Sequence, residues 1–120
     1  MRTASQKGAE GELLARKYLE QLGLTFLSAN WRCKMGEVDL IFQDGDTRAF
    51  IEVRTRSKTS FGSGADTVFF QKQRKLIRTA KYYQQKEQYW GNIRFDVISI
   101  GLQELGDPAI SYIPDAFTET

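Results

Sequence analysis

Two acidic residues, Asp39 and Glu52, lie in alternating runs that predict the two strands of a β-hairpin. The runs cover residues 37–43 and 48–56, and the turn between them reads Asp-Gly-Asp-Thr. If that turn closes the hairpin, Asp39 lies opposite Glu52 on one face. Like charges at such a position destabilise a sheet. A divalent cation shared by the two carboxylates would remove the repulsion, and two carboxylates with waters and a phosphate oxygen suit magnesium.

Two other interpretations of this pair stay open. A pair at a solvated hairpin edge can be tolerated without a ligand, or Arg54 and Arg56 can neutralise it. The opposite face of the hairpin is entirely apolar, so we expect it to face the core. Its expected pairs are Phe42 with Ala49, Leu40 with Ile51, and Val38 with Val53.

Positive charge is concentrated in one stretch of the chain. Residues 48–86 carry ten basic and two acidic residues, a net charge of +8, whereas the remainder carries seven basic and thirteen acidic residues, a net charge of −6. Because Lys and Arg contacts to phosphate dominate nucleic-acid affinity, this segment favours a polyanionic partner. The alternative is a solvated helix face and loop that bind nothing.

The chain has no histidine and one cysteine, Cys33. These counts exclude histidine-dependent nucleophile systems, imidazole zinc sites and an internal disulfide. Any metal must therefore be held by oxygen, which leaves magnesium, manganese or calcium. The N-terminal segment has no apolar run like that of a signal peptide, and no stretch approaches the roughly 18 apolar residues of a membrane span. We expect a cytoplasmic protein without a membrane partner.

Hydrophobic spacing predicts the elements that position these residues, in the order α-β-β-β-α-β-β. The expected helices cover 5–22 and 68–85, the second capped by Thr67, and the expected strands cover 25–31, 37–43, 48–56, 92–100 and 110–113, followed by a short acidic tail. At this length a single domain over residues 1–120 is expected. Glu12 lies on the face of the first helix that should be buried, so it either reaches solvent at the helix end or belongs to a site.

Several short motifs occur along the chain in a fixed order: Gly8-x-x-Gly11-Glu12, Gly36-Glu37-Val38-Asp39-Leu40-Ile41, Phe50-Ile51-Glu52-Val53-Arg54-x-Arg56, Phe61-Gly62, Lys72 and Arg94-Phe95-Asp96-Val97. Together they resemble the YraN family of small uncharacterised bacterial proteins over about residues 5–100. That family is similar to the restriction-endonuclease-like superfamily, whose signature is an acid, a hairpin turn and then (Asp/Glu)-x-Lys, and within it to archaeal Holliday-junction resolvases. The resemblance implies a restriction-endonuclease-like mixed β-sheet flanked by helices.

The resemblance also implies catalytic roles. Asp39 and Glu52 would hold Mg²⁺ or Mn²⁺, Glu12 would complete or support that site, and Arg54 occupies the position of the motif lysine. The implied reaction is metal-dependent hydrolysis of a phosphodiester. Asp96 is either a third acid of the site or the ion-pair partner of an arginine.

The resemblance implies that the partner is nucleic acid, and the similarity to resolvases implies branched DNA. The residues expected to contact the phosphate backbone are Arg56, Lys58, Lys72 and Lys75. Because resolvase-like enzymes cut two strands as symmetric dimers, a homodimer is also implied, with the apolar final strand as one contact.

Arg54 departs from the family signature, since arginine stays protonated and cannot act as a base, although it can still hold a phosphate. A structural alternative for Arg54 is an ion pair with Glu37. Three functions stay open: a metal-dependent endonuclease acting on branched or damaged DNA, a nucleic-acid-binding protein that keeps the fold without the reaction, and a module that holds an acidic protein.

Overall fold

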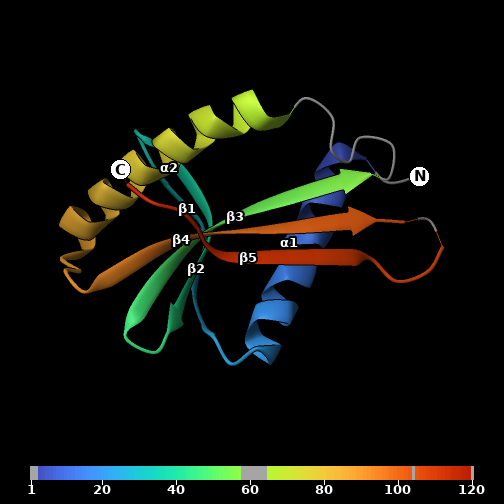
Figure 1. The fold of residues 1–120 in the computed structure, drawn as a ribbon, viewed down its shortest axis with the longest axis horizontal. Helices are drawn as coiled ribbons and strands as arrows, with labels where there is room; N and C mark the ends of the chain where they lie inside the picture. The colour runs from blue at the N-terminus through green and yellow to red at the C-terminus, as the bar shows by residue number, and fades with distance from the viewer. Residues whose placement is uncertain (1–2, 58–64, 104, 120) are drawn as a thin grey trace.

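The computed structural model describes residues 3–57, 65–103 and 105–119 (Figure 1). Its elements are α1 (Ala4–Gln21), β1 (Thr25–Cys33), β2 (Gly36–Asp44), β3 (Thr47–Ser57), α2 (Ala65–Glu87), β4 (Asn92–Leu102) and β5 (Ala109–Phe117). The order α-β-β-β-α-β-β predicted from the sequence is confirmed. Lys58 and the motif at residues 61–62 lie outside the described residues.

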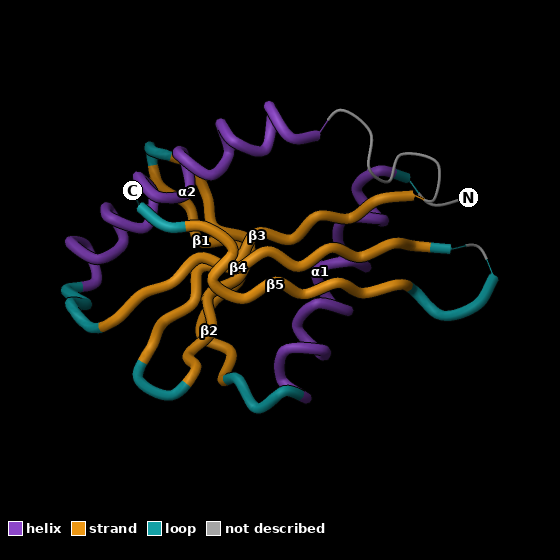
Figure 2. The backbone as a smooth tube through the Cα atoms, viewed as in Figure 1, coloured by secondary structure: helices purple, strands orange, loops and turns teal. Residues whose placement is uncertain are grey.

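The strands form one mixed sheet in the order β1-β2-β3-β4-β5. β3 and β4 are parallel, and the other neighbours are antiparallel. A parallel pair needs a crossover connection, and α2 provides it between β3 and β4 (Figure 2). The mixed sheet flanked by two helices agrees with the restriction-endonuclease-like arrangement expected from the resemblance.

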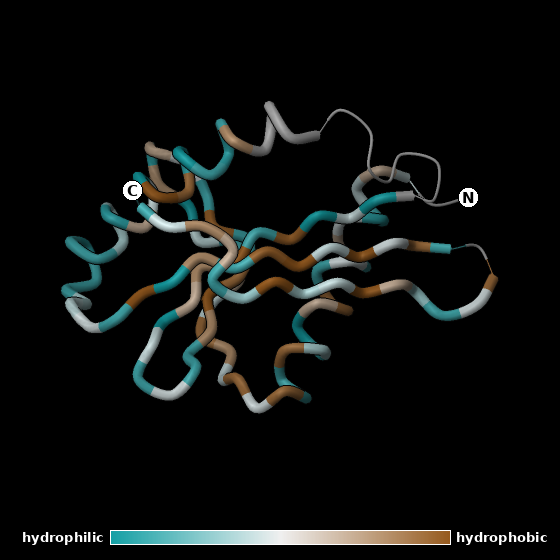
Figure 3. The backbone as a smooth tube through the Cα atoms, in the orientation of Figure 1, coloured by the Kyte–Doolittle hydropathy of each residue, from teal (hydrophilic) through white to brown (hydrophobic). Residues whose placement is uncertain are grey.

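The two faces of the sheet bury two separate hydrophobic clusters, one under each helix. On the α1 side the main members are Ala15, Leu19, Leu40, Phe42, Ala49, Ile51, Ile98, Ile100 and Leu102. On the α2 side they are Val38, Ile41, Phe50, Leu76, Ala80, Tyr83 and Phe95. Figure 3 shows apolar residues recurring along the central strands, as side-chain alternation in a sheet buried on both faces requires. The helices therefore cover opposite faces.

The two helices differ from their predicted bounds in different degrees. α1 agrees within one residue at each end, whereas α2 begins at Ala65, before the expected cap. Thr67 therefore lies inside α2, and its prediction as the N-cap is wrong. Within the described part of the chain, no helix is long and apolar enough to cross a membrane.

α1 approaches β3 closely at Gly11. This glycine is buried, and a β-carbon placed there would overlap the Thr55 side chain. The absence of a side chain therefore lets the first half of α1 lie against β3. Glu12 is carried to the sheet by the same contact, because it is the next residue of the helix.

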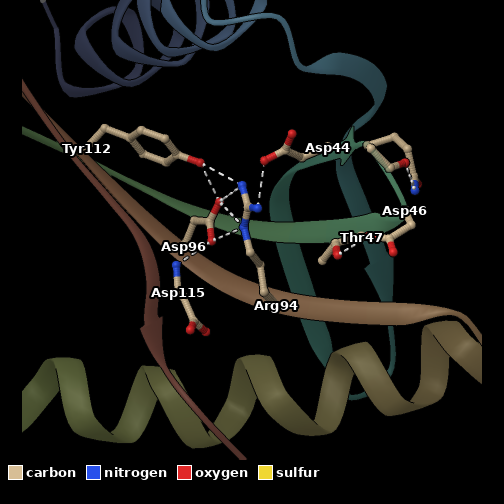
Figure 4. Close-up of polar contacts among 9 residues, drawn as sticks. Asp44, Asp46, Thr47, Arg94, Asp96, Tyr112 and Asp115 are labelled. Atoms are coloured by element: carbon tan, nitrogen blue, oxygen red, sulfur yellow. Dashed lines mark hydrogen bonds and ion pairs between the residues drawn. The ribbon is translucent and has the colours of Figure 1, made fainter.

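A fully buried carboxylate, Asp96, joins β4 to β5 (Figure 4). It accepts hydrogen bonds from Arg94 Nε at 3.0 Å, from the Tyr112 hydroxyl at 2.6 Å and from the Asp115 backbone N–H at 2.9 Å. Arg94 also reaches Asp44 at the end of β2, at 2.7 Å. Burial, followed by the hydrogen bond to Asp96, raises the pKa of Tyr112. Asp96 is thus the ion-pair partner of an arginine, one of the two roles expected for it.

β5 is longer than predicted. We expected a strand over 110–113 followed by an acidic tail, but β5 continues to Phe117. The extension is held by the hydrogen bond from Asp115 to Asp96 and by the stacking of Phe117 on Phe95, with ring centroids 5.2 Å apart. These contacts lie far apart in sequence, which is why local composition did not indicate them.

Candidate functional site

The central hairpin forms in the predicted register. Leu40 pairs with Ile51, and the pairs that follow toward the turn are Ile41 with Phe50, Phe42 with Ala49, Gln43 with Arg48, and Asp44 with Thr47. The ladder extends one pair further than expected, so the turn has two central residues. The first of them is Gly45, whose φ of 60° favours glycine.

The hairpin opens beyond Leu40 and Ile51, where the β2–β3 pairing ends. From there β2 stays paired with β1, and β3 stays paired with β4. Figure 1 shows β2 and β3 diverging. Asp39 and Glu52 are the first residues beyond the last pair, so we call this region the fork. They do not form the directly opposed ladder pair that we predicted, but their two carboxylates still lie close enough to interact. The Asp39 carboxylate instead accepts a hydrogen bond from the Val53 backbone N–H at 2.8 Å, where a strand partner would otherwise bond.

Val38 also departs from the expected facing. Simple alternation places it on the apolar face with Leu40, but it is buried in the cluster under α2. The difference begins where β2 leaves β3, because the alternation of one flat hairpin no longer applies once the strands diverge. Both Val38 and its neighbour Asp39 therefore lie near α2.

A hollow of about 290 Å³ lies at the fork, beneath α2. Its lining residues are Glu37, Asp39, Glu52, Val53, Lys72, Lys75 and Leu76. The carboxylates come from the hairpin strands and the lysines from the crossover helix. The Lys72 Nζ lies 3.6 Å from Glu52 Oε2. The fold thus brings together four of the residues singled out from the sequence: Asp39, Glu52, Lys72 and Lys75.

The electrostatics of the hollow centre on Asp39. Burial, together with the negative charge of Glu52, raises the pKa of Asp39 to about 7, and the hydrogen bond from the Val53 N–H opposes the rise. The pair therefore carries more negative charge than its surroundings compensate, and a proton or a cation would stabilise it.

The donor set fits Mg²⁺. This ion is commonly held by one or two carboxylates, with waters and phosphate oxygens completing its coordination. Asp39 and Glu52 supply the two carboxylates. Over residues 3–57, 65–103 and 105–119, no three Asp, Glu, His or Cys residues gather in a metal-ligand group. The remaining ligands would have to come from water and substrate.

Glu12 lies on α1 and is half-buried. Both of its carboxylate oxygens are within hydrogen-bond reach of Asn30 Nδ2, at 3.2 and 3.1 Å. The β1 neighbours of Asn30 pair with Leu40 and Val38, so Asn30 occupies the position across from Asp39. Glu12 therefore contacts β1 at a register position next to the fork and does not line the hollow.

Asn30 was missed by the sequence prediction. It has a φ of 54°, in the left-handed region where Asn is enriched. The only signal was an asparagine inside an expected strand, and asparagine is depleted in strands.

The arginines of β3 lie further along the strand. Arg54 and Arg56 are half-buried in the part of β3 that pairs with β4. Glu37, which a continued hairpin would have placed opposite Arg54, forms an ion pair with Arg32 at 2.9 Å.

Gly36, at the start of β2, allows α2 to lie close to the fork. Its φ is 147°, and a β-carbon there would lie 2.9 Å from Thr79 Oγ1 and 3.0 Å from Lys75 Cε. A side chain would therefore displace Lys75 from its place above β2. The glycine that opens the Gly-Glu-Val-Asp motif thus positions a lysine of the hollow.

The described part of α2 presents a basic face to solvent. Its exposed basic residues include Lys72, Arg74, Lys75, Arg78 and Lys81. Lys81 forms an ion pair with Glu119, near the chain terminus. The others extend the positive charge of the hollow along the helix.

Fold and site together define a mixed α/β protein whose central hairpin opens at a carboxylate pair, with lysines supplied from the crossover helix. The sequence matches the family described as "Uncharacterised protein family UPF0102" over residues 11–100, and the chain belongs to that family. This match confirms the resemblance to the YraN family that was drawn from the motifs.

Relatives within this family align over most of their length. The chain is 39% identical to a UPF0102 protein of Rhodococcus opacus (strain B4) over 111 residues, 92% of this chain and 94% of the relative. It is 40% identical to one of Pseudomonas putida (strain GB-1) over 116 residues, 94% of each chain. A third, of Pseudomonas fluorescens (strain Pf0-1), is 44% identical over 101 residues, 82% of this chain and 84% of the relative.

Proposed function

We propose that the protein is a metal-dependent nuclease that hydrolyses phosphodiester bonds in DNA, with branched or damaged DNA as its substrate. The observation that carries the proposal is the hollow at the fork, which brings Asp39 and Glu52 together with Lys72 and Lys75. Carboxylates that hold a divalent cation beside lysines that bind phosphate are the groups phosphodiester hydrolysis needs.

The acidic residues of the hollow would bind a cation, and its lysines would bind the anionic substrate. Asp39 and Glu52 would hold Mg²⁺ or Mn²⁺, and the Val53 N–H fixes the orientation of the Asp39 carboxylate. When bound, the ion supplies a Lewis acid that polarises the phosphodiester and lowers the pKa of water. Lys75, which lines the same hollow, would bind a nonbridging phosphate oxygen of the substrate.

The charge along α2 supports a long polyanionic substrate rather than a small phosphate ester. Lys72, Lys75 and Arg78 are exposed on the helix that covers the hollow, with Arg74 between them. Such residues contact successive backbone phosphates and make the affinity fall steeply with salt.

A second candidate function is nucleic-acid binding without hydrolysis. It is favoured by Arg54, because arginine at the motif lysine position cannot exchange a proton with the attacking water. In that case the basic face of α2 would bind DNA with the same salt dependence, but metal would not stimulate cleavage.

Cleavage of branched and nicked DNA in Mg²⁺ or Mn²⁺ tests the proposal. We expect Asp39→Asn and Glu52→Gln to abolish cleavage, and Asp107→Asn, which removes an exposed carboxylate outside the hollow, to retain it. Cleavage that persists in both hollow variants would contradict the assigned site. Salt-sensitive DNA binding by a wild-type protein that cleaves no substrate would favour the second candidate.

A further inference from the structure

One of the two α2 lysines of the hollow lies within ion-pair distance of a carboxylate. Lys72 Nζ lies 3.6 Å from Glu52 Oε2, and Lys72 lines the same hollow as Asp39. The Glu52 side chain is 16% exposed and the Lys72 side chain 58% exposed, so Lys72 is the more accessible partner of this ion pair. A substrate phosphate entering from solvent would meet Lys72 before it reaches Glu52.

We propose that Lys72 is a catalytic residue of this site and supplies from α2 the lysine that β3 lacks at Arg54. The inference rests on the proposed nuclease function. It assigns to Lys72 contact with the reacting phosphate and the attacking water, beyond general attraction for the DNA backbone.

The fold fixes the position of Lys72. Leu76 lies one helical turn later on the same side of α2, is 5% exposed and also lines the hollow. Ala80 continues this side into the core under α2. The buried face of the helix therefore sets the rotation that directs Lys72 toward the fork.

Lysine has the chemistry that this position requires. Its ammonium group is compact and carries three donors, so it can bond Glu52, a phosphate oxygen and the attacking water at once. Arg54 lies on β3 beyond Glu52 and carries a planar group that cannot turn in the same way.

The reaction places the contribution of Lys72 in the transition state. The water oxygen forms a bond to phosphorus as one ester P–O bond breaks, and the electron pair of that bond leaves with its oxygen. The leaving oxygen takes up a proton from solvent, and the attacking water loses one to solvent. Lys72 donates hydrogen bonds that stabilise the negative charge accumulating on the phosphoryl oxygens, so its loss should lower kcat more than it raises KM.

The test compares Lys72→Met and Lys72→Arg with Lys86→Met, which removes an exposed charge from the last turn of the same helix. We expect Lys72→Met to lower kcat by about 100-fold or more with KM changed less than about threefold, as for loss of one charge-stabilising donor. Lys72→Arg should retain part of the rate, and Lys86→Met all of it. An unchanged melting temperature in Lys72→Met would exclude misfolding.

Calorimetric titration of Mg²⁺ gives a readout independent of turnover. Lys72→Met should bind Mg²⁺ at least as tightly as wild type, because a cation that competes for Glu52 is removed. Active wild type with an equally active Lys72→Met would overturn the assignment of Lys72 and leave the nuclease proposal standing. Loss of Mg²⁺ affinity in step with kcat would also overturn it, since Lys72 would then only support the carboxylates. Wild type that cleaves none of the substrates would overturn the nuclease function and this inference together.

Discussion

The affinity of the fork for Mg²⁺ should depend on pH near neutrality. The pKa of Asp39 is raised to about 7, so about one-tenth of these carboxyl groups are protonated at pH 8 and about nine-tenths at pH 6. A carboxylate must lose its proton before it binds a metal. The apparent association constant should therefore fall about tenfold between pH 8 and pH 6, whereas a carboxyl with an ordinary pKa near 4 would produce almost no change.

Isothermal titration of Mg²⁺ at pH 6 and pH 8, in two buffers with different ionisation enthalpies, measures both the affinity and the protons released. We expect close to one proton released per ion at pH 6 and about a tenth of one at pH 8. Asp39→Asn should lose Mg²⁺ binding at both values, and Asp107→Asn should behave as wild type. Equal affinity at the two pH values with no proton release would refute the assignment of the raised pKa to Asp39. Absence of Mg²⁺ binding at either pH would refute the metal site itself.

Further predictions concern stability. The pKa of Asp39 is higher in the folded state, so its contribution to stability is fully present below the unfolded value near 3.8 and is lost as pH rises through about 7. Asp39→Asn should therefore be more stable than wild type at pH 8, by roughly 4 kcal/mol at most. Urea unfolding should show this difference in stability shrinking toward pH 5. Gly11→Ala should lower the free energy of unfolding by about 1–3 kcal/mol, because the new side chain would overlap Thr55. Gly8 has open space around it, so Gly8→Ala should raise the free energy of unfolding by about 0.5–1 kcal/mol. Equal effects of the two variants in chemical denaturation would contradict the close approach of α1 to β3. Asp96→Ala should cost about 3–5 kcal/mol because it leaves Arg94 without its buried partner, and a loss below about 1 kcal/mol would show that the network contributes little.

The register of the hairpin could be predicted because local information determines it. Apolar residues at every second position, Leu40 and Phe42 on one strand and Ala49 and Ile51 on the other, favour one facing, and the Asp-Gly-Asp turn sets the partners. The residues Leu40, Ile51, Phe42 and Ala49 pair as expected for that reason. Charge counting likewise indicated the basic face of α2, since helical spacing alone separates it from the buried stripe.

The fork could not be predicted, because it depends on a competition between a side chain and the backbone. The Asp39 carboxylate takes the hydrogen bond of the Val53 N–H, and nothing in the alternation distinguishes this from continued pairing. The partner of Glu12 was also missed, because Asn30 is 18 residues away in sequence and a strand pattern does not indicate its left-handed backbone. The approach of Lys72 to Glu52 depends on how a helix docks across two strands.

The division of the hollow between a hairpin and a crossover helix has a consequence for folding. β2 and β3 are joined by a two-residue turn, so the two carboxylates meet through a contact that is local in sequence. Lys72 arrives only when α2 docks, and α2 belongs to the long connection that must close before β4 pairs in parallel with β3. Asp39 and Glu52 should therefore come together early in folding. Their carboxylates should repel each other until α2 docks or a cation binds. Divalent ions should then speed refolding at pH values where Asp39 is ionised, and leave the rate unchanged in Asp39→Asn.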